Sequence, residues 1–317
     1  MKILITGATG FVGSNFAYKF IELGHEINLI IRQESDFWRI EPIKDRVKLH
    51  YVDLNNAEDL EKFIFDLKPE IILHFATYGA YQGRQQDVKL TIDTNLLGTI
   101  NLINACGKTD FKCFINTGSS SEYGAKDEPM KETDILEPNN LYGATKAAAA
   151  IYAQFMAKKS DLPIVTMRLF SPYGPFEEGS RLIPSIIKSY LTNIELNIVS
   201  SDSVRDFIFM DDAVSAYLKA IEKIDFAKGH IFNIGAGVQY SFKELADTVK
   251  KITNSDLEPK YGAIKSNQYE PKMWVADISK AKKMLGWEPK FSLEDGLKKD
   301  IEWFNKNLAL YNQKDAK

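Results

Sequence analysis

The chain has 317 residues, 44% of them hydrophobic and 26% charged, a composition that excludes a disordered protein and can bury a substantial core. The formal net charge of −3, without a block of basic residues, argues against binding along a nucleic-acid backbone. The two cysteines, Cys106 and Cys113, have no other metal-ligand residues near them at the spacing of a metal site, so we predict no metal. No apolar stretch is long enough to span a membrane, so we predict no membrane segment and a cytoplasmic location.

Short β-branched runs alternate with longer helical patterns over the first two thirds of the chain. The opening apolar run ends at Thr6, which favours a first strand over a signal peptide. We predict strands at 2–6, 26–31, 47–51, 71–75, 112–117 and 164–169, and helices at 12–23, 57–67, 90–106 and 142–159. This alternation is typical of the α/β class with an open, doubly wound parallel sheet (Rossmann), in which ligands bind at the carboxyl ends of the strands.

Beyond residue 170 the pattern loosens, and prolines and glycines crowd between 172 and 184. We predict a dinucleotide-binding domain over 1–170 and, over 171–317, mainly a smaller C-terminal substrate-binding lobe. Strand-like runs at 207–210 and 230–234 predict that segments near 205–235 return to the first lobe. The tail from Trp274 onward is predicted to form helices separated by 286–289.

A glycine-rich turn follows the first predicted strand and opens the first predicted helix. Its glycines let the backbone approach a pyrophosphate, and the helix N-terminus supplies free amides and a favourable dipole. A tight turn that only packs against the sheet is the alternative, but the strand–turn–helix context favours a dinucleotide loop. The predicted contacts are Gly7, Thr9, Gly10, Phe11, Val12 and Gly13.

Tyr142 and Lys146 stand four residues apart on a predicted helix, so their side chains share one face. An unperturbed Tyr has a pKa of about 10, and a nearby ammonium lowers that pKa toward the range of general acid–base work. Alone, such a pair is more often a solvated helix face. In a chain with a dinucleotide loop it is the strongest catalytic signal.

With this glycine turn and this Tyr/Lys pair, the chain resembles the extended short-chain dehydrogenase/reductases, in particular the nucleotide-sugar epimerases, dehydratases and 4-keto reductases. The resemblance runs nearly end to end and is more specific for the family than for the reaction. Its motifs are the Gly7/Gly10/Gly13 loop, Asp53-Leu54, His74-Phe75-Ala76, Asn95 with Gly98-Thr99, Ser119 with Tyr123-Gly124, Tyr142/Lys146, Arg168 through Pro175, Arg205-Asp206-Phe207 and Leu285-Gly286-Trp287.

The resemblance implies a role for each matching residue. Tyr142 would exchange the proton of a sugar hydroxyl while nicotinamide exchanges a hydride, Lys146 would also hold the nicotinamide ribose, and Ser119 would orient the same sugar oxygen. Asp53 and Leu54 would contact adenine, and Arg205 would grip the nucleotide diphosphate. Further implied cofactor contacts are Phe75, Ala76, Thr77, Asn95, Thr117 and Phe170, and further substrate contacts are Ser120 and Ser171.

Three of these residues have ordinary structural alternatives. Asn95 could bond a loop carbonyl, Ser119 could cap a turn, and Arg205 could form a surface ion pair with Asp206. Family members without catalytic activity, such as dinucleotide sensors, are expected to lose the Tyr142/Lys146 pair. Because this chain keeps both residues, we predict an enzyme.

The end of the second strand bears on the choice between NAD and NADP. NAD-preferring family members usually place an acid where this chain has Ile31, and Arg32 follows it. An Arg there can meet a 2′-phosphate, with Ser35 as a further contact, so NADP(H) is favoured. Glu34 and Asp36 lie nearby and keep NAD(H) possible.

Spacing also bears on the reaction. The 4,6-dehydratases of this family carry an acid two residues before the Tyr-Gly pair, and this chain has Ser121 at that position. Glu122 is one residue further along, and in an extended segment that shift turns the side chain to the opposite face. We therefore favour reduction of a 4-keto-6-deoxy sugar on a nucleotide, with a 4-epimerase retaining NAD as the alternative. Ser171 replaces the family's usual Asn, and Gly79 replaces a Lys of some epimerases. The resemblance also implies a homodimer formed by the helices at 90–106 and 142–159.

Overall fold

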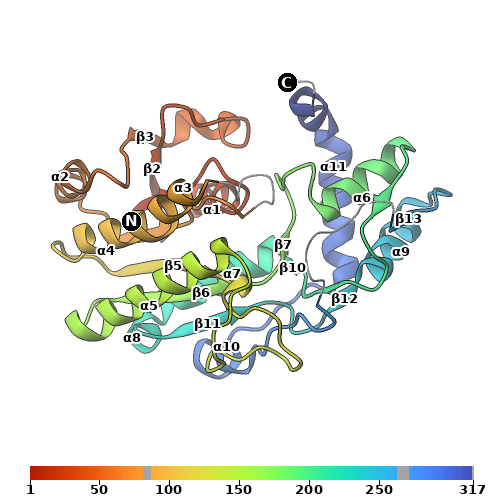
Figure 1. Cartoon of the computed structure of the whole chain (residues 1–317). Helices are drawn as coiled ribbons and strands as arrows, with labels where there is room; N and C mark the ends of the chain where they lie inside the picture. The colour runs from red at the N-terminus through yellow and green to blue at the C-terminus, as the bar shows by residue number, and fades with distance from the viewer. Residues whose placement is uncertain (81–86, 263–270, 316–317) are drawn as a thin grey trace.

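A parallel seven-stranded sheet forms the centre of the larger lobe of the computed structural model, which describes residues 1–80, 87–262 and 271–315 (Figure 1). Its strand order is β11-β6-β5-β4-β1-β2-β3, the doubly wound order extended by one strand. The predicted fold class is confirmed. The strands are β1 (Lys2–Thr6), β2 (Glu26–Ile31), β3 (Lys48–Tyr51), β4 (Ile71–His74), β5 (Cys113–Ser119), β6 (Ile164–Leu169) and β11 (Ile231–Ile234).

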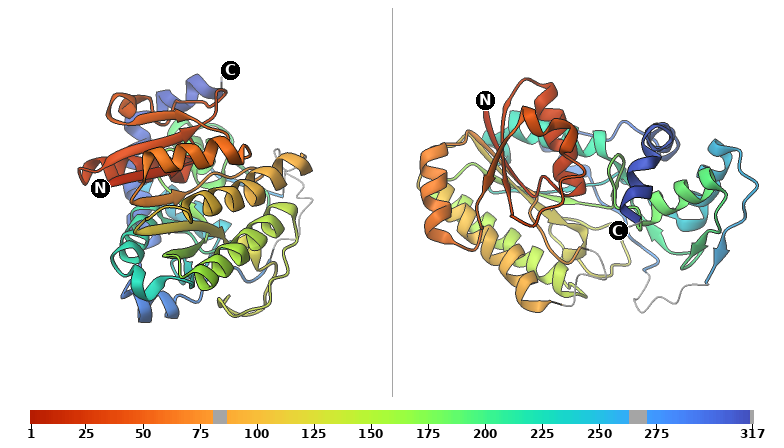
Figure 2. Two further views of the ribbon diagram at one scale, coloured as in Figure 1. Left: turned by 90° about the vertical axis from the view of Figure 1, so that its left-hand side faces the viewer. Right: turned by 90° about the horizontal axis from the view of Figure 1, so that it is seen from above.

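Side chains alternate between two apolar layers, because successive residues of a strand point to opposite faces. In β1, Ile3 and Ile5 join one core cluster, whereas Leu4 between them joins the other. The first cluster is covered by α1 (Phe11–Glu22), α7 (Met210–Glu222) and α10 (Ser279–Leu285). The second is covered by α2 (Ala57–Leu67), α4 (Gly98–Cys106) and α5 (Leu141–Ser160), so helices lie on both faces (Figure 2).

The helix predicted at 90–106 is one helical path with a wide turn in its middle. It consists of α3 (Val88–Ile92), a π-helical turn η3 (Asp93–Leu97) and α4. A π turn inserts an extra residue into the helical repeat and rotates the side chains that follow it. This turn carries Asn95, which is fully buried.

The smaller lobe has its own apolar core, seen on the right of Figure 1. Its helices are α6 (Leu182–Thr192), α9 (Phe242–Thr253) and α11 (Leu293–Asp315). Three two-stranded pairs connect them: β7 (Pro172–Tyr173) with β10 (Ile208–Phe209), β9 (Val204–Arg205) with β12 (Tyr240–Ser241), and β8 (Asn197–Ile198) with β13 (Lys260–Tyr261). The short elements η1 (Glu41–Arg46), η4 (Ser120–Glu122) and α8 (Ile224–Ala227) complete the described structure.

The chain crosses back to the larger lobe in the segment after β9. Both β9 and β10 pair outside the central sheet, although strands were expected near them. The crossing starts within β10, where Ile208 joins the first core cluster while Phe209 joins the core of the smaller lobe. It continues in α7, whose small buried residues allow close packing on α1 and β6. It ends at β11, whose four residues are all buried beside β6. Later in the chain, α10 packs on β11, and Trp287 joins the same core.

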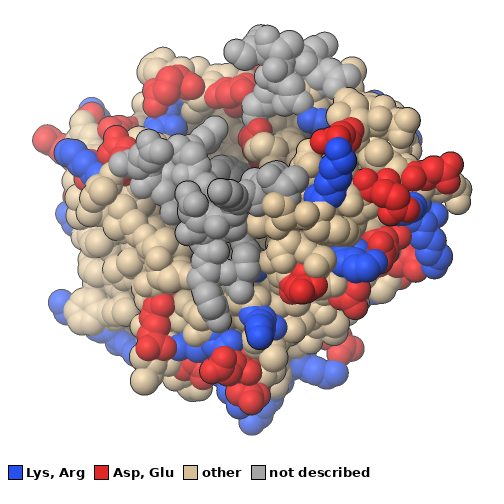
Figure 3. Space-filling view, turned by 45° about the vertical axis from the view of Figure 1, so that its right-hand side comes forward, with Lys and Arg blue, Asp and Glu red and all other residues tan. Residues whose placement is uncertain are grey.

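The surface shows no segregation of charge in the space-filling view, where acidic and basic side chains are interspersed over the face (Figure 3). Among the described residues, none of the helices combines the length and the apolar character that a bilayer-spanning segment requires.

Candidate active site

A cleft of about 1020 Å³ lies at the carboxyl edge of the sheet, between the two lobes. Of the residues predicted for the site, all but Asn95 and Phe170 line it. Those on its wall are Gly7, Thr9, Gly10, Phe11, Val12, Gly13, Arg32, Ser35, Asp53, Leu54, Phe75, Ala76, Thr77, Thr117, Ser119, Ser120, Tyr142, Lys146, Ser171 and Arg205. Residues from eight chain segments therefore converge at the place where a doubly wound sheet binds ligands.

The glycine turn forms a cradle that side chains would fill. Gly7 has a φ of 69°, and a Cβ there would lie 2.5 Å from the backbone nitrogen of Ala76. A Cβ on Gly13 would lie 2.4 Å from the carbonyl oxygen of Gly7. Helix α1 begins after Gly10 without a side-chain cap, which leaves its first-turn amides directed at the cleft edge for an anion. A nucleotide pyrophosphate fits this cradle.

The first turn of α5 packs directly on the segment that follows β5. Asn140 caps α5 by accepting a hydrogen bond from the Gly143 amide at 2.8 Å. A Cβ on Gly143 would lie 2.3 Å from the carbonyl oxygen of Ser121. Tyr142 and Lys146, one turn apart, are thereby held on the same cleft as Ser119. The three predicted catalytic residues are brought together.

Lys146 has an unusual environment for an ammonium group. Only 2% of the residue is exposed, and burial lowers its pKa to about 8, an effect partly offset by the negative charge of Glu122. Below that pH the group remains charged despite its burial. The neighbouring His74 is fully buried, and burial together with the Lys146 charge lowers its pKa to about 3, so it stays neutral. Its ring nitrogens contact the Thr6 and Thr99 hydroxyls at 2.7 and 2.9 Å.

Ser119 caps a turn as well as facing the cleft. Its Oγ accepts a hydrogen bond from the Ser121 amide at 3.2 Å, and the Glu122 carboxylate accepts one from the Ser119 amide at 2.7 Å. Ser119 therefore caps a turn, as the structural alternative predicts, and it also lies on the cleft wall. Ser121 lines the cleft, whereas Glu122 is fully buried and paired with Arg168 at 2.6 Å.

Asn95 is one of the two predicted cofactor contacts that the fold directs away from the cleft. Its amide donates to the Tyr78 carbonyl at 2.9 Å and to the Thr145 hydroxyl at 3.0 Å. Its oxygen accepts from the Tyr78 amide at 2.7 Å and from the Thr77 hydroxyl at 3.1 Å. Asn95 therefore bonds a loop carbonyl, as its structural alternative predicts. Because the π turn directs its side chain inward, it connects the loop after β4 to α5.

Phe170 is the second predicted cofactor contact that does not line the cleft. It is fully buried and packs beside Tyr123, with ring centroids 6.3 Å apart, in a small cluster below the cleft. The residue follows β6, and its side chain takes the inward face, so Leu169 and Ser171 line the cleft in its place.

At the far end of the cleft, the end of β2 carries an exposed charge pair. The Arg32 Nε lies 3.3 Å from the Glu34 carboxylate, with 56% and 68% of the two side chains exposed. The Arg32 amide donates to the Ser35 hydroxyl at 3.0 Å. Exposed pairs of this kind contribute about 0–1 kcal/mol, so the guanidinium is free to reorient toward a ligand.

The smaller lobe supplies the opposite wall. The Arg205 guanidinium lies 5.3 Å from the Trp274 ring and 5.6 Å from the Phe242 ring, and donates to the Val204 carbonyl. The Trp274 indole donates to the Ser120 hydroxyl at 3.2 Å. Flanking rings restrict the guanidinium while leaving its fork able to bind paired oxygens.

Sequence reasoning did not find Trp274, Arg39 or Arg181, which also line the cleft. Arg39 ties the glycine turn to the smaller lobe, donating to the carbonyls of Thr9 and Phe176 at 3.3 and 2.7 Å. These residues lie on connections that have neither periodicity nor motif, and only their place in the fold marks them.

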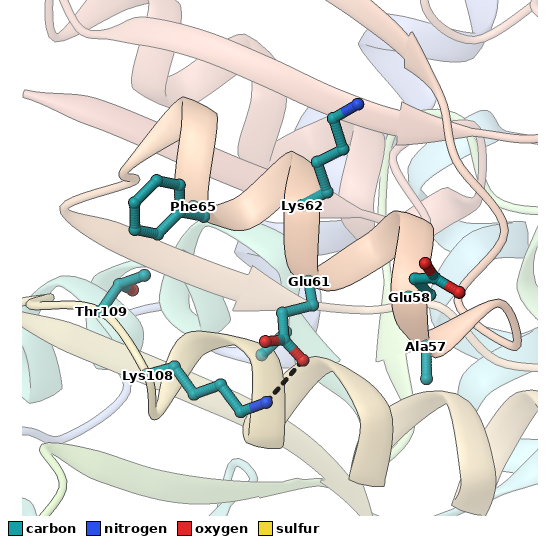
Figure 4. A pocket seen from close by; sticks show the side chains of 8 residues that line it. Ala57, Glu58, Glu61, Lys62, Phe65, Lys108 and Thr109 are labelled. Carbon is teal, nitrogen blue, oxygen red and sulfur yellow. Dashed lines mark hydrogen bonds and ion pairs between the residues drawn. The ribbon is translucent and has the colours of Figure 1, made fainter.

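A second hollow of about 550 Å³ lies on the outside of the larger lobe, between α2 and α4 (Figure 4). The Lys108 ammonium and the Glu61 carboxylate pair across it at 2.6 Å, and Phe65 borders it. None of the residues predicted for the site lies there.

A family model described as the NAD dependent epimerase/dehydratase family matches residues 3–235. The structure is similar to UDP-glucose 4-epimerase of Thermotoga maritima, solved with UDP-glucose, at 30% identity and a TM-score of 0.89, covering 97% of this chain and 100% of that one. It is also similar to UDP-glucuronic acid 4-epimerase of Bacillus cereus, solved with UDP-glucuronic acid and NAD, at 28% identity and a TM-score of 0.86, covering 96% and 99%.

A further relative is a trifunctional protein of Arabidopsis thaliana named as UDP-glucose 4,6-dehydratase, UDP-4-keto-6-deoxy-D-glucose 3,5-epimerase and UDP-4-keto-L-rhamnose-reductase. It is 27% identical over 96% of this chain, which spans 47% of that protein. The match with the family model extends from the first strand to the last strand of the central sheet. This chain is an enzyme of the NAD dependent epimerase/dehydratase family, within the extended short-chain dehydrogenase/reductases that its motifs indicated.

Proposed function

We propose that the protein transfers a hydride between a nicotinamide dinucleotide and C4 of a nucleotide-diphosphate sugar, acting as the reductase of a 4-keto-6-deoxy sugar. One observation carries the proposal: Ser119, Tyr142 and Lys146 share a single cleft with the glycine cradle. The dinucleotide, when bound, supplies or accepts the hydride. Acid–base chemistry and orientation are left to the protein.

In the proposed reduction, the Tyr142 hydroxyl donates a proton to the sugar oxygen that gains negative charge. Ser119 hydrogen-bonds the same oxygen and fixes its orientation. The Lys146 ammonium, one helical turn away, stabilises the phenolate that remains. We assign Ser120, Ser171 and Arg205 to the nucleotide-sugar side, where the Arg205 fork would bind diphosphate oxygens.

Dehydration is disfavoured by the position of the acid beside Tyr123. Glu122 is fully buried and already accepts hydrogen bonds from the Ser119 amide and from Arg168. Ser121 lines the cleft at the place of the dehydratase acid, and a hydroxyl is too weak an acid to exchange a ring proton near neutral pH.

A 4-epimerase is the second candidate, and the two solved relatives named as 4-epimerases favour it. Two measurements separate the candidates: the nucleotide released on denaturing the purified protein, and the consumption of NADPH or NADH with UDP- or dTDP-4-keto-6-deoxyglucose. A reductase releases little nucleotide and consumes reduced cofactor with the keto sugar. Bound NAD with no net consumption would identify an epimerase.

We propose that NADP(H) is preferred, although the relatives solved with a named dinucleotide contain NAD. Arg32→Asp is expected to weaken NADPH affinity at least tenfold and leave NADH affinity equal or higher, because a carboxylate repels a 2′-phosphate. Fluorescence titration of both cofactors measures the ratio. Arg46→Asp, the same charge change at an exposed position outside the cleft, is the control. An unchanged ratio in Arg32→Asp would refute the assignment.

We also propose that two copies associate through α5. Ile151 and Phe155, one turn apart on α5, are 58% and 50% exposed and together place two large apolar side chains on one face of the helix. Sedimentation is expected to give a dimer for the native protein and a monomer for Phe155→Asp. Phe226→Asp, which changes a residue 73% exposed on α8, is expected to leave the dimer intact. A native protein that sediments as a monomer at micromolar concentration contradicts this.

A further inference from the structure

A buried ion pair lies directly behind the segment that carries Ser119. The Arg168 Nε donates to the Glu122 carboxylate at 2.6 Å, and the two side chains are 2% and 0% exposed. Burying two opposite charges costs free energy that their attraction often fails to return, so a buried pair is weak evidence for a purely stabilising role. The surroundings of this pair indicate what else it does.

The two carboxylate oxygens of Glu122 have different partners. One accepts from Arg168, and the other accepts from the Ser119 amide at 2.7 Å. Gly118 leaves the space for this arrangement, because a Cβ there would lie 2.5 Å from the carboxylate and 3.0 Å from the Arg168 side chain. Glu122 therefore fixes the backbone of Ser119 relative to β6.

Arg168 is anchored in turn on its other side. Its Nη1 donates to the Tyr123 hydroxyl at 2.9 Å, and that hydroxyl donates to the Asn233 oxygen at 2.7 Å. The Asn233 amide group donates to the Met130 carbonyl at 2.8 Å. The guanidinium cannot swing away from Glu122 without breaking this chain of hydrogen bonds, which joins β6, the residue directly after η4, and β11.

Helix α5, which carries Lys146, packs directly on η4, the turn that carries Glu122. The titratable groups around this ammonium are Tyr142 on its own helix, His74 on β4, Glu122 on η4 and, behind Glu122, Arg168 on β6. His74 is held neutral, and the charge of Arg168 is directed at Glu122. Within the described residues, Glu122 is the negative charge that acts on Lys146 and favours its protonated form.

We propose that Glu122 is a positioning residue with two tasks: it holds Ser119 in place through the Ser119 amide, and it supplies the counter-charge for the Lys146 ammonium, with Arg168 holding the carboxylate. The inference rests on the proposed function, in which that ammonium assists Tyr142. Glu122 lies one residue after the position at which the family's dehydratases carry their acid. In this proposal its task involves no proton exchange with the substrate.

The test is a titration of Lys146 by trace acetylation with acetic anhydride across pH, followed by mass spectrometry of the Lys146 peptide in the full-length protein. In Glu122→Gln the midpoint is expected to move about one pH unit lower, since loss of a negative charge disfavours the ammonium. The alkaline limb of the turnover profile should move with it. Glu122→Asp keeps the charge and is expected to keep the midpoint, with turnover reduced by the lost reach to Ser119.

Glu122→Gln leaves the Arg168 charge buried alone and is expected to be destabilised, so Glu122→Gln/Arg168→Gln provides a second measurement. Its midpoint is expected between those of Glu122→Gln and the native protein. Asp212→Asn, the same chemical change at a buried carboxylate bonded to the Lys290 and Phe291 amides, should leave the midpoint unchanged. A native midpoint in either Glu122→Gln variant overturns the inference. The proposed function fails separately, if Tyr142→Phe stays active.

Discussion

Tyr142→Phe is expected to lower turnover about 10³-fold while leaving the fold and the affinity for the dinucleotide unchanged. The substitution removes one hydroxyl and no apolar contact, so α5 should keep its packing on β5 and β6. What it removes is the route by which a proton reaches the sugar oxygen. Turnover, thermal unfolding and cofactor titration on the same preparation separate these effects.

Tyr152→Phe is the matched control, because it makes the same change nearly three turns further along α5. The Tyr152 hydroxyl donates to Asn104 at 2.6 Å, outside the cleft. Turnover within about twofold of the native rate is expected. Near-native turnover in Tyr142→Phe would remove Tyr142 from the chemistry.

Gly7→Ala is expected to destabilise the protein by about 2–5 kcal/mol and to abolish detectable dinucleotide binding. Left-handed backbone costs about 1–2 kcal/mol for a residue with a Cβ, and overpacking costs about 1–3 kcal/mol more. The added methyl group would meet the backbone of Phe75 and Ala76, 2.5–2.7 Å away, at the centre of the sheet edge. Either the glycine turn or the loop after β4 must shift, and both line the cofactor half of the cleft.

Gly24→Ala separates strain from steric conflict. Gly24 has a φ of 76°, close to that of Gly7, but nothing lies within 4 Å of a Cβ built there. Its cost is expected to be backbone strain alone, about 1–2 kcal/mol, with cofactor affinity unchanged. Equal destabilisation of the two variants, measured by chemical denaturation, would show that close packing at Gly7 is unimportant.

The sequence predicts the central sheet well because most of its strands, the edge strand β3 excepted, are largely buried on both faces and rich in apolar residues. Each of the six strands expected in the first half is present within two residues of its predicted bounds. The pattern fails where strands shrink to two residues, as in β7, β9 and β10, since periodicity cannot develop over so short a length. Such segments are defined by the lobe that packs around them.

Within the site, too, residues placed by the strand pattern are predicted, and residues placed by long-range contacts are not. Residues at or just after the carboxyl ends of strands, such as Ser119 and Gly7, are placed on the cleft by the topology alone. Asn95 does not line the cleft because it lies in a π-helical turn, which no local sequence pattern predicts and which directs its side chain inward. Arg39 was missed because its task, joining Thr9 to Phe176 across the lobes, depends on contacts far apart in the sequence.

The central claim is hydride transfer between a dinucleotide in this cleft and C4 of a nucleotide sugar. Its most direct test is incubation of the protein with NADPH or NADH deuterated at the transferable C4 position and with UDP- or dTDP-4-keto-6-deoxyglucose, followed by mass spectrometry. One deuterium on C4 of the sugar product, absent with Tyr142→Phe, is the predicted result. No deuterium in the sugar with either cofactor, from protein that binds both ligands, would contradict the claim.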